Sequence, residues 1–253
     1  MSVPSIPQRP DFSHHLTLAG HLEELRRRLA IGLAALCLGI GISATQAERL
    51  MRWLQQPAQP YLTRFAFFSP TEPLLAYLKV AVLAALTVSM PVLLWQLWAF
   101  VRTGLTIRER HMGLALAGWG SALFVGGAAF GYAILVPVSL RVLLSIGRDR
   151  LEPVISIDTY LSFVSTLLLW CGVIFELPIV LWLLAKVGVV TPEWLRQQRP
   201  YAILVLVILA AIITPTTDPV NLLLMSCPLI VLYEVSIHVA KCAGLRREPG
   251  GDP

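Results

Sequence analysis

Six stretches of the sequence are apolar and almost free of charged residues. The chain of 253 residues is 56% hydrophobic and 14% charged, whereas soluble domains carry about 25% charged residues. A helix needs about 20 apolar residues to cross the hydrocarbon core of a bilayer. The stretches are continuous, so they do not show the ten-residue alternation of a transmembrane barrel. We therefore predict an all-α integral membrane protein with spans at 29–47, 80–101, 111–140, 159–185, 200–217 and 219–233.

The last two of these spans are short. Only thirteen apolar residues precede the "TPTTDP" turn at 214–219, and the stretch after it is of similar length. At 1.5 Å per residue, each would cover about 20 Å of a hydrocarbon core of about 30 Å. Between the first two spans, residues 48–72 are too long and too apolar for a plain connection. We expect them to form short interfacial helices with Trp53, Tyr61, Phe65, Phe67 and Phe68 at the membrane boundary.

Lysine and arginine are unevenly divided between the two sides of this arrangement. An even number of spans places both termini on one side, and cytoplasmic segments carry the excess of basic residues. With the termini inside, 13 of the 20 basic residues are cytoplasmic and six are outside. We predict cytoplasmic termini, with residues 1–28 as the N-terminal segment and 239–253 as the tail of a single domain over 1–253. Topology accounts for the net charge of +5, and no nucleic-acid partner is expected.

Familiar catalytic and metal-binding patterns do not occur in the sequence. It has no GxxxxGK[ST] phosphate loop, no HExxH motif and no CxxC pair. The chain is therefore not expected to be an enzyme or to carry a cofactor or a metal ion. The energy for any work on a substrate must therefore come from a source other than this chain.

Acidic residues in or beside the spans carry the most functional information, because each is costly in lipid. Glu176 lies within the fourth span, two residues before Pro178. It is either a functional group or a carboxylate bonded to a neighbouring helix. Glu24 and Glu109 lie at the cytoplasmic rims, where composition alone favours solvated helix ends with pairs such as Glu24 and Arg28. Asp218 fits a helix cap in the outer turn, and Glu234 fits the membrane interface.

Seven short motifs occur in a specific order along the chain. They are "HLEELRRRL" at 21–29, "FSPTEPLLAYLKV" at 68–80, "PVLLWQLWAFVRTGLTIRER" at 91–110, "FGYAILVP" at 130–137, "FELP" at 175–178, "ITPTTDPVN" at 213–221 and "LYE" at 232–234. Each alone is weak, but in this order on six spans they are specific. The chain resembles the TatC family, the polytopic receptor subunit of the twin-arginine protein translocase.

The resemblance implies a function as well as a fold. Such proteins form a concave bundle, bind signal peptides with a consecutive Arg pair, and export folded cargo with the proton gradient. Their partners are TatA/TatB-like single-span subunits, and self-association in the cell inner membrane is expected. The family's receptor carboxylates fall on Glu24 and Glu109, and its motifs add Arg26 and Arg110 to the signal-peptide site. Because carboxylates bind planar guanidinium groups in bidentate fashion, this assignment replaces the solvated-end interpretation.

The same resemblance assigns further positions. Glu176 matches an intramembrane carboxylate that faces a concave, partly hydrated groove. Structural or partner contacts fall on Pro91, Phe100, Asp218 and Glu234. The chain departs from the common pattern at Thr103, where many relatives carry Pro. The alternative is a proton-coupled small-solute transporter using Glu176, although no inverted repeat accompanies it. A scaffold in which the acids only specify helix packing is a third interpretation.

Overall fold

The described residues of the computed structural model are 18–62, 64–101, 113–145, 154–213 and 219–244. They are almost entirely helical, and the only strand-like pairing among them is one bridge between Ala66 and Ser156. The helices are α1 (Leu18–Thr45), α2 (Ala47–Gln55), the 3-10 turn η1 (Gln56–Ala58), α3 (Glu72–Val101), α4 (Gly113–Phe130), the π-helical turn η4 (Gly131–Leu135), α5 (Val136–Ser145), α6 (Ile157–Phe175), α7 (Leu177–Val187), α8 (Pro192–Gln197), α9 (Arg199–Ile213) and α10 (Pro219–Gly244).

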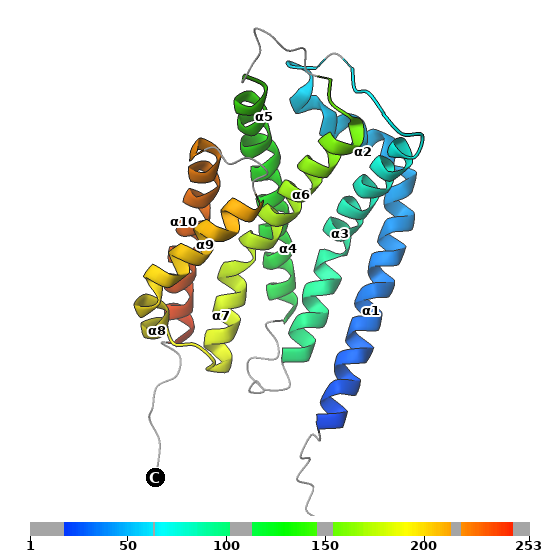
Figure 1. Cartoon of the computed structure of the whole chain (residues 1–253). Helices are drawn as coiled ribbons and strands as arrows, with labels where there is room; N and C mark the ends of the chain where they lie inside the picture. The colour runs from blue at the N-terminus through cyan, green and yellow to red at the C-terminus, as the bar shows by residue number, and fades with distance from the viewer. Residues whose placement is uncertain (1–17, 63, 102–112, 146–153, 214–218, 245–253) are drawn as a thin grey trace, which may run out of the picture.

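These helices make six passes through the molecule. The third pass runs through α4, η4 and α5, and the fourth runs through α6 and α7. Five passes are long and apolar enough to cross a membrane, and α9 is a shorter apolar helix. Figure 1 shows the start of α1 and the end of α10 at the same end of the molecule. The predicted all-α, six-span fold is confirmed. Which end faces the cytoplasm stays a prediction.

The two predicted short spans differ from each other in the structure. Helix α9 has 15 residues, or about 22 Å of rise, and is short as predicted. The prediction for the last span is wrong, because α10 has 26 residues and its apolar stretch runs over Leu222–Lys241. No Gly or Pro stands between Pro228 and Gly244 to end the helix. Glu234 does not end it either, because its carboxylate accepts a hydrogen bond from Arg199 at 2.6 Å.

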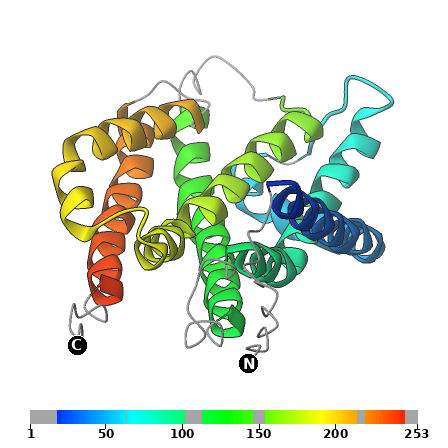
Figure 2. The ribbon, with the colours of Figure 1, turned by 90° about the horizontal axis from the view of Figure 1, so that it is seen from below.

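Contacts between helices run from one edge of the molecule to the other, and the last pass packs beside the fourth. Helix α1 packs on α3 at one edge, and α10 packs on α7, α8 and α9 at the other. Helices α3, α4 and α6 connect these edges through contacts with one another, as the view in Figure 2 also shows. On α1, Leu29, Leu33 and Leu38 are exposed by 59–70%. Such a surface is suited to lipid rather than to water.

Small residues allow the central helices to approach closely. A Cβ atom on Gly127 of α4 would lie 2.5 Å from the backbone oxygen of Cys171 on α6. A Cβ atom on Gly172 would lie 2.7 Å from the ring of Phe124. No side chain fits at these separations without movement. The close approach of α4 and α6 fixes the position of the α6–α7 junction, where Glu176 lies.

The segment between α1 and α3 caps one end of the bundle. As predicted, it contains short helices, α2 and η1. The Tyr132 hydroxyl donates to the backbone oxygen of Trp53 at 2.8 Å, and their rings stack 4.0 Å apart. The Tyr160 hydroxyl donates to the backbone oxygen of Leu54 at 2.7 Å, and Phe65 packs on the Tyr160 ring. Phe65 therefore packs inward, whereas Trp53 stacks on Tyr132 and stays 45% exposed. Phe67 and Phe68 are exposed by 65% and 71%.

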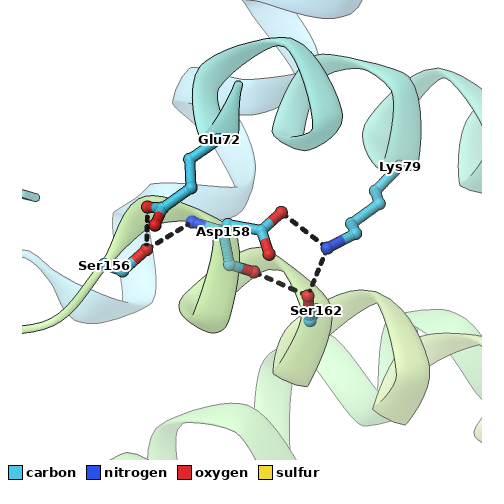
Figure 3. A network of polar contacts seen from close by, with 5 residues as sticks. All are labelled: Glu72, Lys79, Ser156, Asp158 and Ser162. Carbon is cyan, nitrogen blue, oxygen red and sulfur yellow. Dashed lines mark hydrogen bonds and ion pairs between the residues drawn. The ribbon is translucent and has the colours of Figure 1, made fainter. Parts of the chain in front are cut away.

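A polar network joins the first turns of α3 and α6 at the same end (Figure 3). Lys79 Nζ donates to Asp158 Oδ1 at 2.5 Å and to Ser162 Oγ at 2.7 Å. The Ser156 hydroxyl donates to the Glu72 carboxylate and accepts from the Asp158 backbone N–H at 3.2 Å. We call these five residues the α3–α6 network. Its bonded residues are separated by up to 84 positions in the sequence, and the sequence pattern did not predict it.

Candidate functional site

Glu24 lies near the start of α1, and its carboxylate is held by the guanidinium of Arg28. Arg28 Nη2 lies 2.5 Å from Glu24 Oε1, and Arg28 Nε donates to the same oxygen at 3.1 Å. Arg28 Nη1 also donates to Gln96 Oε1 of α3 at 3.5 Å. No described residue donates to Glu24 Oε2. The predicted pairing of Glu24 with Arg28 is confirmed, and one carboxylate oxygen is left for another donor.

The pair is shielded from solvent without being buried. The Arg28 and Glu24 side chains are exposed by 18% and 25%. Arg26 is exposed and makes no described contact with the pair. Because it is two residues from Glu24, its side chain leaves α1 on a different face. The structure therefore brings together Glu24, Arg28 and Gln96, and it leaves Arg26 beside them on the open surface.

An apolar groove continues from this pair between α1 and α3. It has a volume of about 310 Å³. Arg28 and Gln96 stand at its polar end, and Phe100 also lines it. The remaining lining residues are Leu25, Leu29, Gly32, Leu33, Leu36, Leu93 and Leu97. The groove thus has an apolar wall along its length, and one of its two polar lining residues, Arg28, is the partner of Glu24. Of these residues, Phe100 was singled out from the sequence, by motif alone.

Three predicted site residues, Glu109, Arg110 and Asp218, lie outside the described residues, as does Thr103. Pro91 is exposed inside α3, and the helix continues through it to Val101. In Figure 1 the end of α3 and the start of α4, which flank residues 102–112, lie at the same end of the molecule as the start of α1.

Glu176 stands at the junction of α6 and α7. Its backbone N–H donates to Val173 at 3.1 Å, and Pro178 in the first turn of α7 has no N–H to continue the α6 ladder. The side chain is 6% exposed, and neither carboxylate oxygen has a hydrogen-bond partner among the described residues. Within the described part of the chain, Glu176 is therefore not bonded to a neighbouring helix.

The surroundings of Glu176 leave room for one small polar group. A Cβ atom on Gly120 of α4 would lie 3.1 Å from Glu176 Oε2, so the glycine makes space for the carboxylate. A cavity of about 20 Å³ is lined by Glu176, Leu94, Trp98 and neighbouring apolar residues. The Trp98 indole N–H also lacks a partner among the described residues. About 10–15 Å³ of such space holds one water molecule, so the cavity is large enough for one.

Comparison with known proteins places this arrangement in a family. The model of the family described as Sec-independent protein translocase protein (TatC) matches residues 20–228. The chain belongs to the TatC family. The TatC protein of Carboxydothermus hydrogenoformans is 38% identical over 226 residues, which cover 89% of this chain and 93% of the relative. The TatC protein of Aquifex aeolicus is 37% identical over 238 residues, covering 92% and 98% of the two chains.

A solved structure agrees with the sequence relatives. The crystal structure of a twin arginine translocase receptor, TatC, matches with a TM-score of 0.78 and 37% identity, over 88% of this chain and 99% of that one. TatC proteins are multi-pass membrane subunits of a Sec-independent protein translocase and are not enzymes. The family, the absence of an enzymatic role and the helical fold predicted from the motifs are confirmed. The small-solute transporter is not supported.

Proposed function

We propose that this TatC-family chain is the receptor and core subunit of a twin-arginine translocase. It binds signal peptides that carry a consecutive Arg pair, with Glu24 and Glu109 as the receptor carboxylates. It lies in the cell inner membrane with both termini in the cytoplasm. TatA/TatB-like single-span subunits join it and, with the proton gradient, export the folded cargo. The proposal rests on family membership and on the state of the Glu24 carboxylate.

One observation carries the assignment of Glu24. Its carboxylate already binds a guanidinium, that of Arg28, through a single oxygen. The geometry of the site is therefore suited to guanidinium recognition, and Oε2 is available to an incoming Arg. A planar guanidinium binds such oxygens through two N–H groups, whereas an ammonium group acts as a point charge. Binding should consequently favour Arg-Arg over Lys-Lys.

The groove between α1 and α3 supports the same proposal. A signal peptide consists of a basic segment followed by an apolar one. The receptor surface offers both kinds of contact, because Arg28, which lines the apolar groove, is paired with the carboxylate of Glu24. We infer that Arg residues bind at Glu24 and that the first apolar residues of the peptide contact Leu29, Leu33 and Leu97.

Glu176 is proposed to act inside the membrane and not in binding the Arg pair. It supplies a polar atom inside the membrane for the signal peptide, for a partner subunit or for bound water. The unpartnered oxygens and the adjoining cavity support this role. Arg26 and Arg110 are assigned to the signal-peptide surface by motif alone.

The test is binding of synthetic signal peptides to the purified chain in detergent. Glu24→Ala and Glu109→Ala are each expected to weaken binding of an Arg-Arg peptide by about tenfold or more, because a charged hydrogen-bonded partner is lost. A Lys-Lys peptide should bind weakly to all forms. Glu48→Ala is the matched control, because Glu48 is exposed by 74% at the opposite end of α1. Undiminished binding by the Glu24→Ala, Glu109→Ala double variant would refute the assignment.

A further inference from the structure

A second charged pocket lies between α8 and α10, at the far edge of the molecule from α1. It has a volume of about 90 Å³ and is lined by basic side chains from both helices and from the start of α9. Arg196, Arg199, His238 and Lys241 line it, together with Glu193, Pro192 and Ile237. We propose that this pocket binds the phosphate headgroup of an anionic phospholipid. The proposal is independent of the signal-peptide site.

The charge balance of the pocket favours an anion. Arg196, Arg199 and Lys241 are cationic, and Glu193 is the one carboxylate in the lining. Glu234 compensates part of this charge, because its Oε2 lies 2.6 Å from Arg199 Nη2. Three cations and two carboxylates give the pocket a net positive charge, without counting His238. Basic pockets between transmembrane helices are a typical site for anionic headgroups.

Two unused nitrogens indicate where a ligand would bind. Arg199 Nε is buried and has no hydrogen-bond partner among the described residues. A buried guanidinium N–H without an acceptor is costly, and a phosphate oxygen would satisfy it. His238 Nδ1 lies 2.8 Å from the backbone oxygen of Glu234. Because a carbonyl oxygen only accepts, Nδ1 carries the proton, and Nε2 of the neutral ring is an acceptor that suits a hydroxyl group of a headgroup rather than its phosphate.

The position of the pocket identifies the source of the phosphate as a lipid. The apolar stretch of α10 ends at Lys241, and α9 begins at Arg199. The pocket therefore lies at the level where apolar helix surface gives way to charge. Trp194 and Tyr201 beside it are exposed by 49% and 67%, and such aromatic residues are typical of the membrane interface.

An exposed apolar face begins directly after the pocket. Residues Tyr201, Leu204, Val205, Ile208 and Ile212 of α9 are exposed by 50–74%. They stand at positions i, i+3, i+4, i+7 and i+11, which lie on one face of the helix. A phospholipid with its phosphate beside Arg199 would lay its acyl chains along this face. A free phosphate ion would leave the face uncovered, which is why a lipid fits better.

The experiment is native mass spectrometry of the full-length chain released from micelles that contain phosphatidylglycerol and phosphatidylcholine in equal amounts. We expect the wild type to retain one phosphatidylglycerol in clear preference to phosphatidylcholine. Arg196→Gln with Lys241→Gln should reduce that retention about tenfold or more, since each basic residue near an anionic surface contributes to binding. The Arg49→Gln, Arg52→Gln variant removes two exposed charges at the other end of the molecule and should retain the lipid as wild type does.

Three outcomes would overturn the proposal. One is equal retention of phosphatidylglycerol by the wild type and the Arg196, Lys241 double variant. Another is loss of retention to the same extent in the Arg49, Arg52 control. The third is full displacement of the lipid by millimolar inorganic phosphate, which would identify a free-phosphate site. If the double variant fails to fold, Lys241→Gln alone is measured, because Lys241 is exposed. Signal-peptide binding is not involved, so the receptor proposal stands or fails separately.

Discussion

Helix α6 carries an acidic group at each end, and the two are in opposite states. Asp158 in its first turn belongs to the α3–α6 network, where Lys79 reaches it at 2.5 Å (Figure 3). Glu176 at its last turn is 6% exposed, and its oxygens have no partner among the described residues. A buried charge stabilises a fold only when it is paired and hydrogen-bonded. The first end of α6 therefore adds a paired charge to the packing of α3 on α6, whereas the buried Glu176 carboxyl group adds no such pair among the described residues.

The largest effect on stability is expected at the network. Asp158→Leu leaves the Lys79 ammonium group without its carboxylate. The side chains are exposed by 36% for Lys79 and 24% for Asp158, so the loss of unfolding free energy should be about 1–3 kcal/mol, below the value for a fully buried pair. The midpoint of thermal unfolding in detergent, followed by size-exclusion chromatography, should fall by several degrees.

The double variant Lys79→Met, Asp158→Leu supplies the control for this comparison. It removes both charges and fills the space with apolar groups, so it should recover most of the lost stability. Equal loss in the double and the single variant would show that the ion pair is not what joins α3 to α6. The bond from Ser156 to Glu72 would then be the main polar link between the two helices.

The opposite sign is expected at Glu176. Glu176→Gln keeps the shape and removes the ionisable group, so the free energy of unfolding should stay the same or rise by up to about 1 kcal/mol. Export of an Arg-Arg cargo in cells should nevertheless fall, because the polar site inside the membrane is altered. The measurements are the thermal midpoint of the purified chain and the amount of exported cargo. A stability loss as large as that of Asp158→Leu would contradict the contrast between the two ends of α6.

The sequence predicts interactions between nearby residues but not those between distant ones. Apolar runs and the Glu24–Arg28 pair were predictable because they depend on residues close together in the chain. The Lys79–Asp158 pair spans 79 positions, and nothing local to either residue identifies the other. The one available signal was that both are charged residues near the outer starts of predicted spans. Pairing them requires the packing of α3 on α6, which only the structure supplies.

Contacts between residues far apart in the sequence also explain why the last span was predicted too short. They explain as well why the site was predicted only in part. Glu234 was interpreted as an interface marker, but its partner Arg199 lies 35 positions away, and with that pair made the helix continues to Gly244. Glu176 was singled out correctly as a charge inside a span. That its oxygens lack partners depends on Gly120 and Trp98 of other helices. That Glu24 and Glu109 lie close enough together to bind one Arg pair remains a prediction.

The smallest effect is expected at Arg28. Its partner Glu24 shows a third state of a carboxylate, because it is partly shielded from solvent and paired within one helix. Arg28→Gln should change the free energy of unfolding by only a few tenths of a kcal/mol, because a single i,i+4 ion pair within one helix contributes about that much. It frees Glu24 Oε1 from its internal partner, so the affinity for an Arg-Arg peptide should rise by about two- to fivefold. Arg27→Gln, at an exposed neighbour, removes the same charge without touching Glu24 and is the matched control. Peptide titration of the three proteins measures the difference. A drop in affinity as large as that of Glu24→Ala would mean that Arg28 is part of the receptor surface and not a group that the signal peptide displaces.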